Sequence, residues 1–420
     1  MKKTETNYSR RSFLKVSSLS GGGMMLGISW FASAKPVESL GELNIEPVWQ
    51  EVTSFIKIAS DNSIKIFSPN PEFGQNVMTS LPMLIAEELD VDWKQVEVEQ
   101  GNYDNKAFPR QFTGGSQGVR MAWKQLRTVG AAARQMILTA ASQAWNLPVS
   151  ELTTSNGLVT HAFSGKSESY GTFAEAASKL PVPKDIVLKG NQSFRLLGTP
   201  QKNVVGPKIV QGKPLFGLDY REAGMLYAMT ERPPAFGMQL KSFDATAAKK
   251  MPGIVDIFPI KVYNDDHKFA GFDTRSFNEV IAVVGKSTWD VMNARKKIKA
   301  VWEVGPERNE AGQNNRETVI PSGLESTKKH YAQMLEMDKK PGRIERKDGD
   351  PEKAFAEAKH VIERTFTAPF LAHNIMEPTN TFAHFVGDKV RFVAPIQIPD
   401  MMVPSMVARL GIPKENISIE

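Results

Sequence analysis

The alternation of hydrophobic and polar positions predicts a hairpin followed by a helix. Residues 52–58 and 63–68 alternate between apolar and polar side chains on either side of a short polar turn at 61–63, which is typical of two paired strands. Apolar residues then recur at helical spacing over 77–89, and alternation returns at 96–99. We therefore expect a helix that connects two strands of one sheet.

A second and longer helix is predicted after the loop that contains Thr113–Ser116. Apolar or small residues recur there at spacings of four and three: Val119, Trp123, Leu126, Gly130, Ala133, Ile137, Ala140 and Ala144. Gly130 and the alanines beside it make one face small, so a neighbouring backbone can approach closely. Together these elements predict an α+β domain over residues 45–195.

The rest of the chain predicts further units. Proline and glycine gather at 197–212, which is the best linker candidate. Residues 212–303 contain strand-like and helical stretches of a second α+β unit, and residues 361–420 start a further domain in which order returns at 361–367. The expected elements are strands at 254–258, 280–284, 298–303, 382–385, 390–393 and 416–420, and helices at 243–251, 288–297 and 401–410.

A charged connector separates the last two units. Residues 301–360 hold 23 charged residues in 60, twelve acidic and eleven basic, and this density is typical of a solvated surface segment. We therefore predict a connector over 304–360. The final domain stops inside a predicted strand, so we expect it to be incomplete.

The N-terminus resembles an export signal. Arg10 and Arg11 precede a Phe-Leu pair and a weakly apolar run, and Ala32-Ser33-Ala34 offers a cleavage site, as in twin-arginine signal peptides. A membrane anchor is the alternative, but the run of about 16 residues with three consecutive glycines is short for a span, which needs about 20. We predict a signal over 1–34, cleavage near Ala34 and a periplasmic protein.

Composition then narrows the possible partners. The 420 residues include 52 Lys and Arg against 46 Asp and Glu, a formal charge of +6. Residues 1–34 hold five of the basic and one of the acidic residues, so the remainder carries only +2. This excess gives no reason to expect nucleic acid as a partner. The absence of cysteine excludes disulfides, cysteine nucleophiles and cysteine-bound iron–sulfur clusters in this chain.

Two glycine-containing loops are the main candidates for binding chemistry. Thr113-Gly114-Gly115-Ser116 enters the long helix, where Ser116 could cap the helix and free N–H groups would favour an anion. The alternative is an ordinary turn with an N-cap. Gly74 and Gln75 precede the first helix in the same way, with an amide that can bond to a polar ligand.

Other candidates are weaker. His373 and Glu377 are four residues apart and His384 could add a third metal ligand, but Pro378 disfavours a helix there and the spacing fits no zinc pattern. We assign no metal ligand. Gln397 lies between two prolines and could present its amide to a ligand or belong to a plain loop. Motifs of serine hydrolases, phosphate-loop proteins and dinucleotide-binding folds are absent from the sequence.

The ordered set of motifs resembles the molybdenum-binding large subunit of the xanthine dehydrogenase/aldehyde oxidase family, and within it the branch of the isoquinoline 1-oxidoreductase beta subunit. The segments that resemble its pterin-binding part are 73–76 (FGQN), 81–88 (LPMLIAEE), 113–116 (TGGS) and 156–161 (NGLVTH). Those that resemble its α/β-hammerhead domain are 212–227, 232–234, 251–253 and 287–289, and those that resemble the next cofactor-binding domain are 373–378 (HNIMEP), 395–397 (PIQ) and 407–413.

The resemblance implies an α+β, multidomain fold in which molybdenum-cofactor-binding segments flank a hammerhead domain. It implies a molybdenum hydroxylase that oxidises an N-heterocycle or an aldehyde with water as the oxygen source. The cofactor would be molybdenum–molybdopterin in its cytosine dinucleotide form, held by Gly74, Gln75 and Gly114–Ser116, with Gln397 near the metal. Because this chain has no cysteine, a small [2Fe-2S] subunit would accept the electrons.

Two departures from the family pattern qualify that expectation. The family has Gly-Gln-Gly where this chain has Gly74-Gln75-Asn76, which puts close approach of the cofactor at Asn76 in doubt. The family's next glycine-rich stretch and its catalytic glutamate would lie beyond Glu420, so no catalytic residue is assigned. The rival hypothesis is a non-catalytic fragment or binding module.

Overall fold

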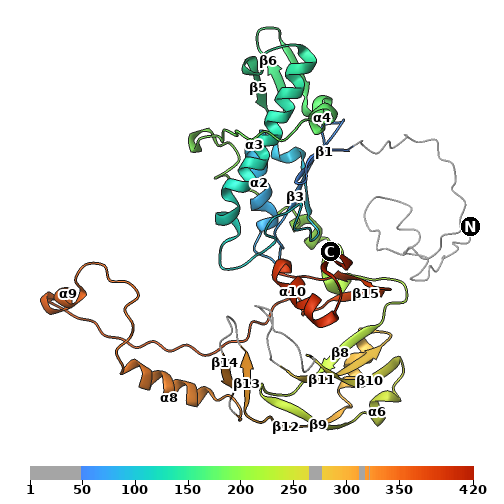
Figure 1. The fold of residues 1–420 in the computed structure, drawn as a ribbon, viewed down its shortest axis with the longest axis vertical. Helices are drawn as coiled ribbons and strands as arrows, with labels where there is room; N and C mark the ends of the chain where they lie inside the picture. Colours follow the sequence, from blue (N-terminus) through green and yellow to red (C-terminus); the bar gives the residue numbers. More distant parts are fainter. Residues whose placement is uncertain (1–48, 264–276, 312–316, 321) are drawn as a thin grey trace, which may run out of the picture. The chain divides into compact units, whose positions relative to one another are not determined.

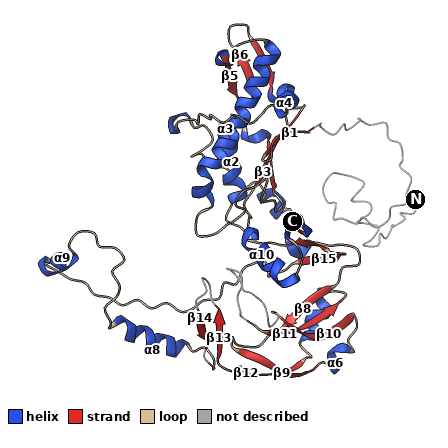
Figure 2. Ribbon diagram, viewed as in Figure 1, coloured by secondary structure: helices blue, strands red, loops and turns tan. Residues whose placement is uncertain are grey.

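The computed structural model describes residues 49–263, 277–311, 317–320 and 322–420. The predicted signal at 1–34 and its cleavage site lie outside the described residues. Helices and strands alternate along the described chain, so the α+β class is confirmed (Figures 1 and 2). The predicted domain boundaries, and the hammerhead arrangement for 212–303, stay predictions.

The first sheet and the helix that crosses it follow the predicted pattern except at 52–58, where a turn at 54–55 divides the expected single strand between two strands. The sheet has the order β1-β2-β3-β4, with β1 at Trp49–Thr53, β2 at Ile56–Ala59, β3 at Ile64–Ser68 and β4 at Val96–Gln100. β2 and β3 are antiparallel, whereas β3 and β4 are parallel. A parallel pair requires a crossover connection, which α2 (Val77–Leu89) supplies. The alternating isoleucines of β2 and β3 are fully buried.

The long helix α3 (Gly118–Trp145) packs against α2 through the predicted small face. A Cβ atom at Gly130 would lie 2.2 Å from the carbonyl oxygen of Ile85, so the two backbones approach as closely as glycine permits. The elements that complete this core are a hairpin sheet of β5 (Leu152–Ser155), β6 (Leu158–His161) and β7 (Lys166–Ser169), and helix α4 (Tyr170–Ser178).

Charged side chains are buried where α2 ends. Glu87, Glu88 and Asp90 are at most 6% exposed. Lys189 Nζ lies 3.1 Å from Glu87 Oε1 and 3.0 Å from Asp90 Oδ1, and Arg127 Nη2 lies 2.7 Å from Glu88 Oε1. Because buried charges need partners, the Lys189 pairs tie the segment around that residue to the end of α2, and the Arg127 pair ties α3 to α2.

This cluster predicts a pH-dependent stability. Burial favours the neutral acid, but hydrogen bonds from the N–H groups of Leu196 and Leu197 and from Lys189 hold the pKa of Glu87 below its ordinary value. A depressed carboxyl pKa stabilises the fold above the unfolded value of about 4.3, and this stabilisation is lost as pH falls through the folded value. We expect the free energy of unfolding, measured by urea titration, to decline below about pH 4.

Glu87→Gln provides the comparison for that prediction. It should be less stable than the wild type at pH 7 and should show a shallower decline in acid, because the residue no longer takes up a proton. Equal slopes for the two proteins would contradict the assignment to Glu87.

The second unit contains the strands predicted at 254–258, 280–284 and 298–303, but it also contains a strand at Met238–Asp244 that was not predicted. Its main sheet has the order β10-β11-β8, and β12 pairs with β9 in a second, two-stranded sheet. A helix was predicted from residue 243, but β9 continues to Asp244 and the helix is a single turn. The elements are α5 (Gly206–Val210), β8 (Tyr227–Glu231), β9 (Met238–Asp244), α6 (Thr246–Lys249), β10 (Ile254–Lys261), β11 (Glu279–Gly285), α7 (Thr288–Arg295) and β12 (Lys299–Val304).

The charged connector contains short elements. They are the hairpin strands β13 (Arg308–Ala311) and β14 (Glu317–Ile320) and the helices α8 (Thr327–Asp338) and α9 (Pro351–Glu357), and neither helix buries a residue. The prediction that order returns at 361–367 is wrong in the sense that no helix or strand forms there. Ile362 and Phe366 are 81% and 91% exposed, so no packing holds this segment in a regular conformation.

The final segment forms a small mixed sheet beside a helix. The sheet order is β15-β16-β17, in which β16 and β17 are parallel. Its elements are β15 (Phe382–Val386), β16 (Lys389–Val393), α10 (Pro399–Leu410) and β17 (Ile417–Ile419). Among the described helices, none combines the length and the apolar character that a membrane span requires.

Candidate functional site

The loop between β3 and α2 carries the first two predicted site residues. Gly74 has a φ of +106°, and a Cβ atom there would meet nothing within 4 Å, so open space borders its backbone. The amide of Gln75 turns back into its own loop. Its Oε1 accepts from the N–H of Phe73 at 2.8 Å, and its Nε2 donates to the carbonyl of Pro71 at 3.0 Å. Gln75 therefore orders the loop as well as bordering the open space.

Asn76 stands where the family pattern has glycine, and its backbone adopts a conformation that glycine favours. Its φ is +69°, in the left-handed region that glycine favours. Asparagine is one of the few other residues that adopt this region routinely. The side-chain Oδ1 accepts a hydrogen bond from Thr79 Oγ1 at 2.7 Å. The chain path therefore survives without the glycine, although a side chain now occupies the position.

The loop before α3 brings Gly114, Gly115 and Ser116 to the start of a helix, but the predicted cap is wrong. The N-cap residue is Gln117, and no side chain caps the helix. Ser116 has a φ of +55°, whereas a capping residue needs extended backbone. The first turn also contains no acidic residue. The start of α3 therefore offers its N–H groups and its positive dipole end without a side-chain partner.

The structure joins Gln397 to this loop, although 284 positions separate Gln397 from Thr113. Gln397 Nε2 donates to the carbonyl of Thr113 at 2.7 Å, and the N–H of Thr113 donates to the carbonyl of Gln397 at 3.1 Å. A Cβ atom at Gly114 would lie 3.6 Å from the same Nε2. Gln397 and the glycine loop therefore form one continuous surface.

One carbonyl group joins the two glycine loops. The carbonyl of Pro71 accepts from Gln75 Nε2 and also from Thr113 Oγ1, the latter at 2.9 Å. Asn70 Nδ2 adds a bond to the carbonyl of Phe112 at 2.5 Å. The segments 70–76, 112–117 and 395–397, which include the predicted motifs at 73–76, 113–116 and 395–397, therefore meet through direct hydrogen bonds.

A buried glutamine that the sequence did not indicate supports this junction. Gln111 is 1% exposed, and its Nε2 donates to the carbonyls of Asn102 at 3.0 Å and Pro69 at 3.2 Å. Its Oε1 accepts from the N–H of Asp104 at 2.7 Å. A single polar residue in an irregular loop carries no periodic signal, so only the folded chain reveals this role.

Asp400 and Tyr103 form a second feature that sequence reasoning missed. Burial raises the pKa of Asp400 above its ordinary value, although the N–H of Gln111 and the hydroxyl of Tyr103 bond to the carboxylate. Burial and the charge of Asp400 raise the pKa of Tyr103. The N–H of Tyr103 also donates to the carbonyl of Ile419 at 3.0 Å. These contacts hold the start of α10, which follows directly after Gln397, against the loop that contains Tyr103 and Gln111.

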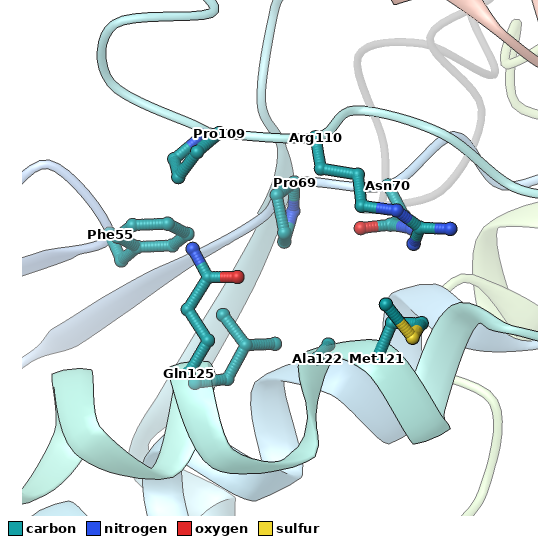
Figure 3. A pocket seen from close by; sticks show the side chains of 9 residues that line it. Phe55, Pro69, Asn70, Pro109, Arg110, Met121, Ala122 and Gln125 are labelled. Atoms are coloured by element: carbon teal, nitrogen blue, oxygen red, sulfur yellow. The ribbon is translucent and has the colours of Figure 1, made fainter.

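A shallow hollow lies beside the first loop, and Figure 3 shows Arg110, Pro69 and Asn70 at its edge opposite Gln125. Its enclosed volume is about 10 Å³, enough for a single water molecule. A larger hollow of about 230 Å³ lies at the C-terminal end of α2, beside Asp90 and Trp93, and includes none of the predicted site residues. Neither hollow is lined by a predicted site residue.

The possible histidine–glutamate metal site is not assembled. Glu377 Oε1 accepts from the N–H of Gly217 at 2.8 Å and from Asn380, whereas His384 Nδ1 lies 3.5 Å from Glu222. Within the described ranges, no group of three or more His, Asp or Glu side chains could hold a metal ion.

Family models place this site in a known class. Two models of a molybdopterin cofactor-binding domain match the chain, one at residues 6–213 and the other at residues 335–420. The first match includes the loops around Gln75 and Gly114, and the second includes Gln397. The chain therefore carries segments of molybdopterin cofactor-binding domains, which supports its assignment to the xanthine dehydrogenase/aldehyde oxidase family.

Curated relatives agree with this class. The chain is 29% identical over 295 residues to the beta subunit of isoquinoline 1-oxidoreductase from Brevundimonas diminuta, covering 60% of this chain and 35% of the relative. It is 26% identical over 434 residues to the membrane-bound aldehyde dehydrogenase [pyrroloquinoline-quinone] of Gluconacetobacter polyoxogenes, covering 99% and 51%. The chain thus spans between about a third and a half of the length of these two relatives.

Solved structures give a weaker likeness. The Cu,Mo-CO dehydrogenase in its carbon monoxide reduced state matches with a TM-score of 0.35 and 19% identity, over 53% of this chain and 30% of that chain. A likeness at this level transfers no residue positions.

Proposed function

We propose that this chain is the cofactor-binding part of the large subunit of a molybdenum hydroxylase that oxidises an N-heterocycle or an aldehyde, with water as the oxygen source. One observation carries the proposal. The two segments that match molybdopterin cofactor-binding domains meet through the reciprocal hydrogen bonds of Thr113 and Gln397. A ligand that needs both segments would find them already joined.

The residues at this junction fit the chemistry of such a cofactor. Open space at Gly74 and the left-handed backbone at Gly115 and Ser116 leave room for a flat, hydrogen-bonding ring system to approach the main chain. The uncapped start of α3 suits the anionic part of a dinucleotide, which supports a dinucleotide form of the cofactor. When bound, the molybdenum cofactor would supply the two-electron redox chemistry.

Within this proposal each loop has a defined task. The N–H groups at Gly114–Gly118, except that of Gln117, which donates to the carbonyl of Gly114, would hold the anionic part. The amides of Gln75 and Gln397 would bond to the polar edge of the pterin. Thr113 would hold Gln397 in place through its own N–H and carbonyl. Asp400, whose pKa is raised by burial, would keep α10 fixed against the neighbouring loop.

A partner subunit forms the second part of the proposal. The chain has no cysteine, so it cannot ligate an iron–sulfur cluster by thiolates. A small [2Fe-2S] subunit would therefore receive the electrons. Two relatives, from isoquinoline 1-oxidoreductase and from the nicotinate dehydrogenase of Pseudomonas putida, are named as subunits of their enzymes, which supports an assembly of several chains.

Export to the periplasm forms the third part. Arg10, Arg11 and the Ala32-Ser33-Ala34 site support a twin-arginine signal. That route carries folded cargo, so the cofactor would be inserted before export. N-terminal sequencing of periplasmic protein should begin near Lys35, and Arg10→Lys with Arg11→Lys should retain the protein in the cytoplasm.

Cofactor content tests the proposed function. We expect about one molybdenum and one pterin per chain in the assembly with its partner subunit, measured by elemental analysis and by pterin fluorescence after denaturation. Gln397→Ala removes one hydrogen bond to Thr113, worth about 1 kcal/mol, so pterin content at limiting cofactor should fall about fivefold. Gln192→Ala, an exposed glutamine outside the three loops, is the control.

Two results would contradict this proposal. A wild-type assembly without molybdenum or pterin would favour the rival hypothesis of a non-catalytic binding module. Equal pterin content in the Gln397 and Gln192 variants would remove Gln397 from the site.

A further inference from the structure

We propose that Glu72 is the positioning residue of the cofactor site, because its carboxylate holds the loop before α2 in the conformation that presents Gln75. The inference rests on the proposed function. The Glu72 carboxylate is an anion that belongs to the loop itself. Its negative charge influences where the anionic part of the cofactor can bind.

The carboxylate of Glu72 bonds to three backbone N–H groups. Oε1 accepts from Gly74 at 2.7 Å and from Asn76 at 3.0 Å, and Oε2 accepts from Met78 at 2.9 Å. The side chain of Asn76, the N-cap residue of α2, makes no capping bond. Glu72 therefore takes over the capping of α2 from a position four residues before the helix boundary.

These bonds fix one conformation in a stretch of backbone that could adopt others. Gly74 and Asn76 both have positive φ values, +106° and +69°. A non-glycine residue in the left-handed region is less stable than in the right-handed one, and one carboxylate oxygen bonds to the N–H groups of both residues. Loss of the carboxylate would allow both residues to change conformation together. The amide of Gln75, which lies between them, would then lose its position. Its bond to the carbonyl of Pro71, which also accepts from Thr113, would be lost as well.

The same charge distinguishes the two helix starts at the site. The positive dipole end of α2 already has a carboxylate, and a second anion there would be repelled. The start of α3 has neither a side-chain cap nor an acidic residue in its first turn. Glu72 thereby directs the anionic part of the cofactor to α3 and leaves the α2 loop to the neutral pterin.

The experiment compares Glu72→Ala and Glu72→Gln in the full chain. The matched control is Asp350→Ala, which removes a carboxylate that caps α9 through the N–H of Lys353 at 3.2 Å and lies in the charged connector. In cofactor-free protein we expect hydrogen exchange in the peptide 71–79 to be at least about tenfold faster in Glu72→Ala than in the wild type. The control should leave this peptide unchanged.

Two further readouts separate positioning from simple helix capping. Pterin content of Glu72→Ala at limiting cofactor should fall about tenfold, and added formate should restore both protection and pterin content by supplying the missing carboxylate. Glu72→Gln keeps one acceptor oxygen and should show an intermediate loss, which makes the test informative if the alanine variant does not fold.

The outcomes are distinct. Faster exchange with unchanged pterin content would overturn the proposal, because Glu72 would then only cap the helix. Unchanged exchange would overturn it as well. A wild-type protein without pterin would overturn the proposed function, while the exchange rates, measured without cofactor, would still decide whether Glu72 holds the loop.

Discussion

Replacing Gly130 by alanine is expected to destabilise the protein by at least about 3 kcal/mol, although alanine is the better helix former. A Cβ atom at this position would lie 2.2 Å from the carbonyl oxygen of Ile85, and 3.0 Å from the Cβ of Glu88. The gain in helix propensity is only about 1 kcal/mol. Because the clash is with the backbone carbonyl of Ile85 and not with a flexible side chain, α2 and α3 would have to move apart. Urea titration should show the decrease in the free energy of unfolding.

Gly118→Ala is the matched control in the same helix. A Cβ atom there would meet only Val77 Cγ1, at the ordinary distance of 3.5 Å. This variant should leave the free energy of unfolding within about 0.5 kcal/mol of the wild type. If Gly130→Ala were as stable as Gly118→Ala, the close crossing of α2 and α3 would be wrong.

Removing the guanidinium of Arg127 is expected to cost about 3–5 kcal/mol, the usual range for breaking a buried ion pair. Glu88 is fully buried, and Arg127 bonds to its Oε1 through Nε at 2.9 Å and Nη2 at 2.7 Å. The guanidinium of Arg127 also lies against the rings of Trp123 and Phe194, at 5.4 and 4.9 Å from their centroids. Arg127→Leu would leave a buried carboxylate without its main partner.

A double-mutant cycle separates the pair from the packing. Glu88→Leu together with Arg127→Leu should cost clearly less than the sum of the two single changes, because no buried charge is then left alone. Lys179→Ala, which breaks the exposed pair with Glu175, should leave the thermal midpoint within about 1 °C. Additive losses in the cycle would show that Arg127 acts by packing alone.

Local pattern was sufficient for the two main helices of the first unit and for several strands, but not for every element of this fold. The spacing of apolar residues predicted the helix over 77–89, and the structure begins and ends α2 at the same residues. The prediction for α3 included its small face, because glycine and alanine at helical spacing indicate a helix surface that a neighbouring backbone can approach closely. Periodicity failed at 361–367, where apolar residues occur without packing partners that would give them a regular conformation.

The sequence predicted the loops of the site separately, but it could not predict that they lie together. No local rule relates Gln397 to Thr113, since the bond between them depends on how two distant segments fold against each other. The role of Ser116 was misjudged because the preference of serine for N-caps was read without the φ value that decides it. The role of Glu72 was not predicted because its partners are backbone N–H groups, which every residue other than proline has, so no sequence pattern indicates the contact.

The sequence by itself determined the class of fold, the main helices and strands, the family and the loops most suited to a cofactor, because these depend on local spacing and on motifs. Only the tertiary structure decided which carboxylates are buried in ion pairs, which helix start keeps its N–H groups without a side-chain partner, and how Gln75, Gly114 and Gln397 come together. Those features depend on hydrogen bonds between residues far apart in the chain, whose partners exist only after the backbone has folded.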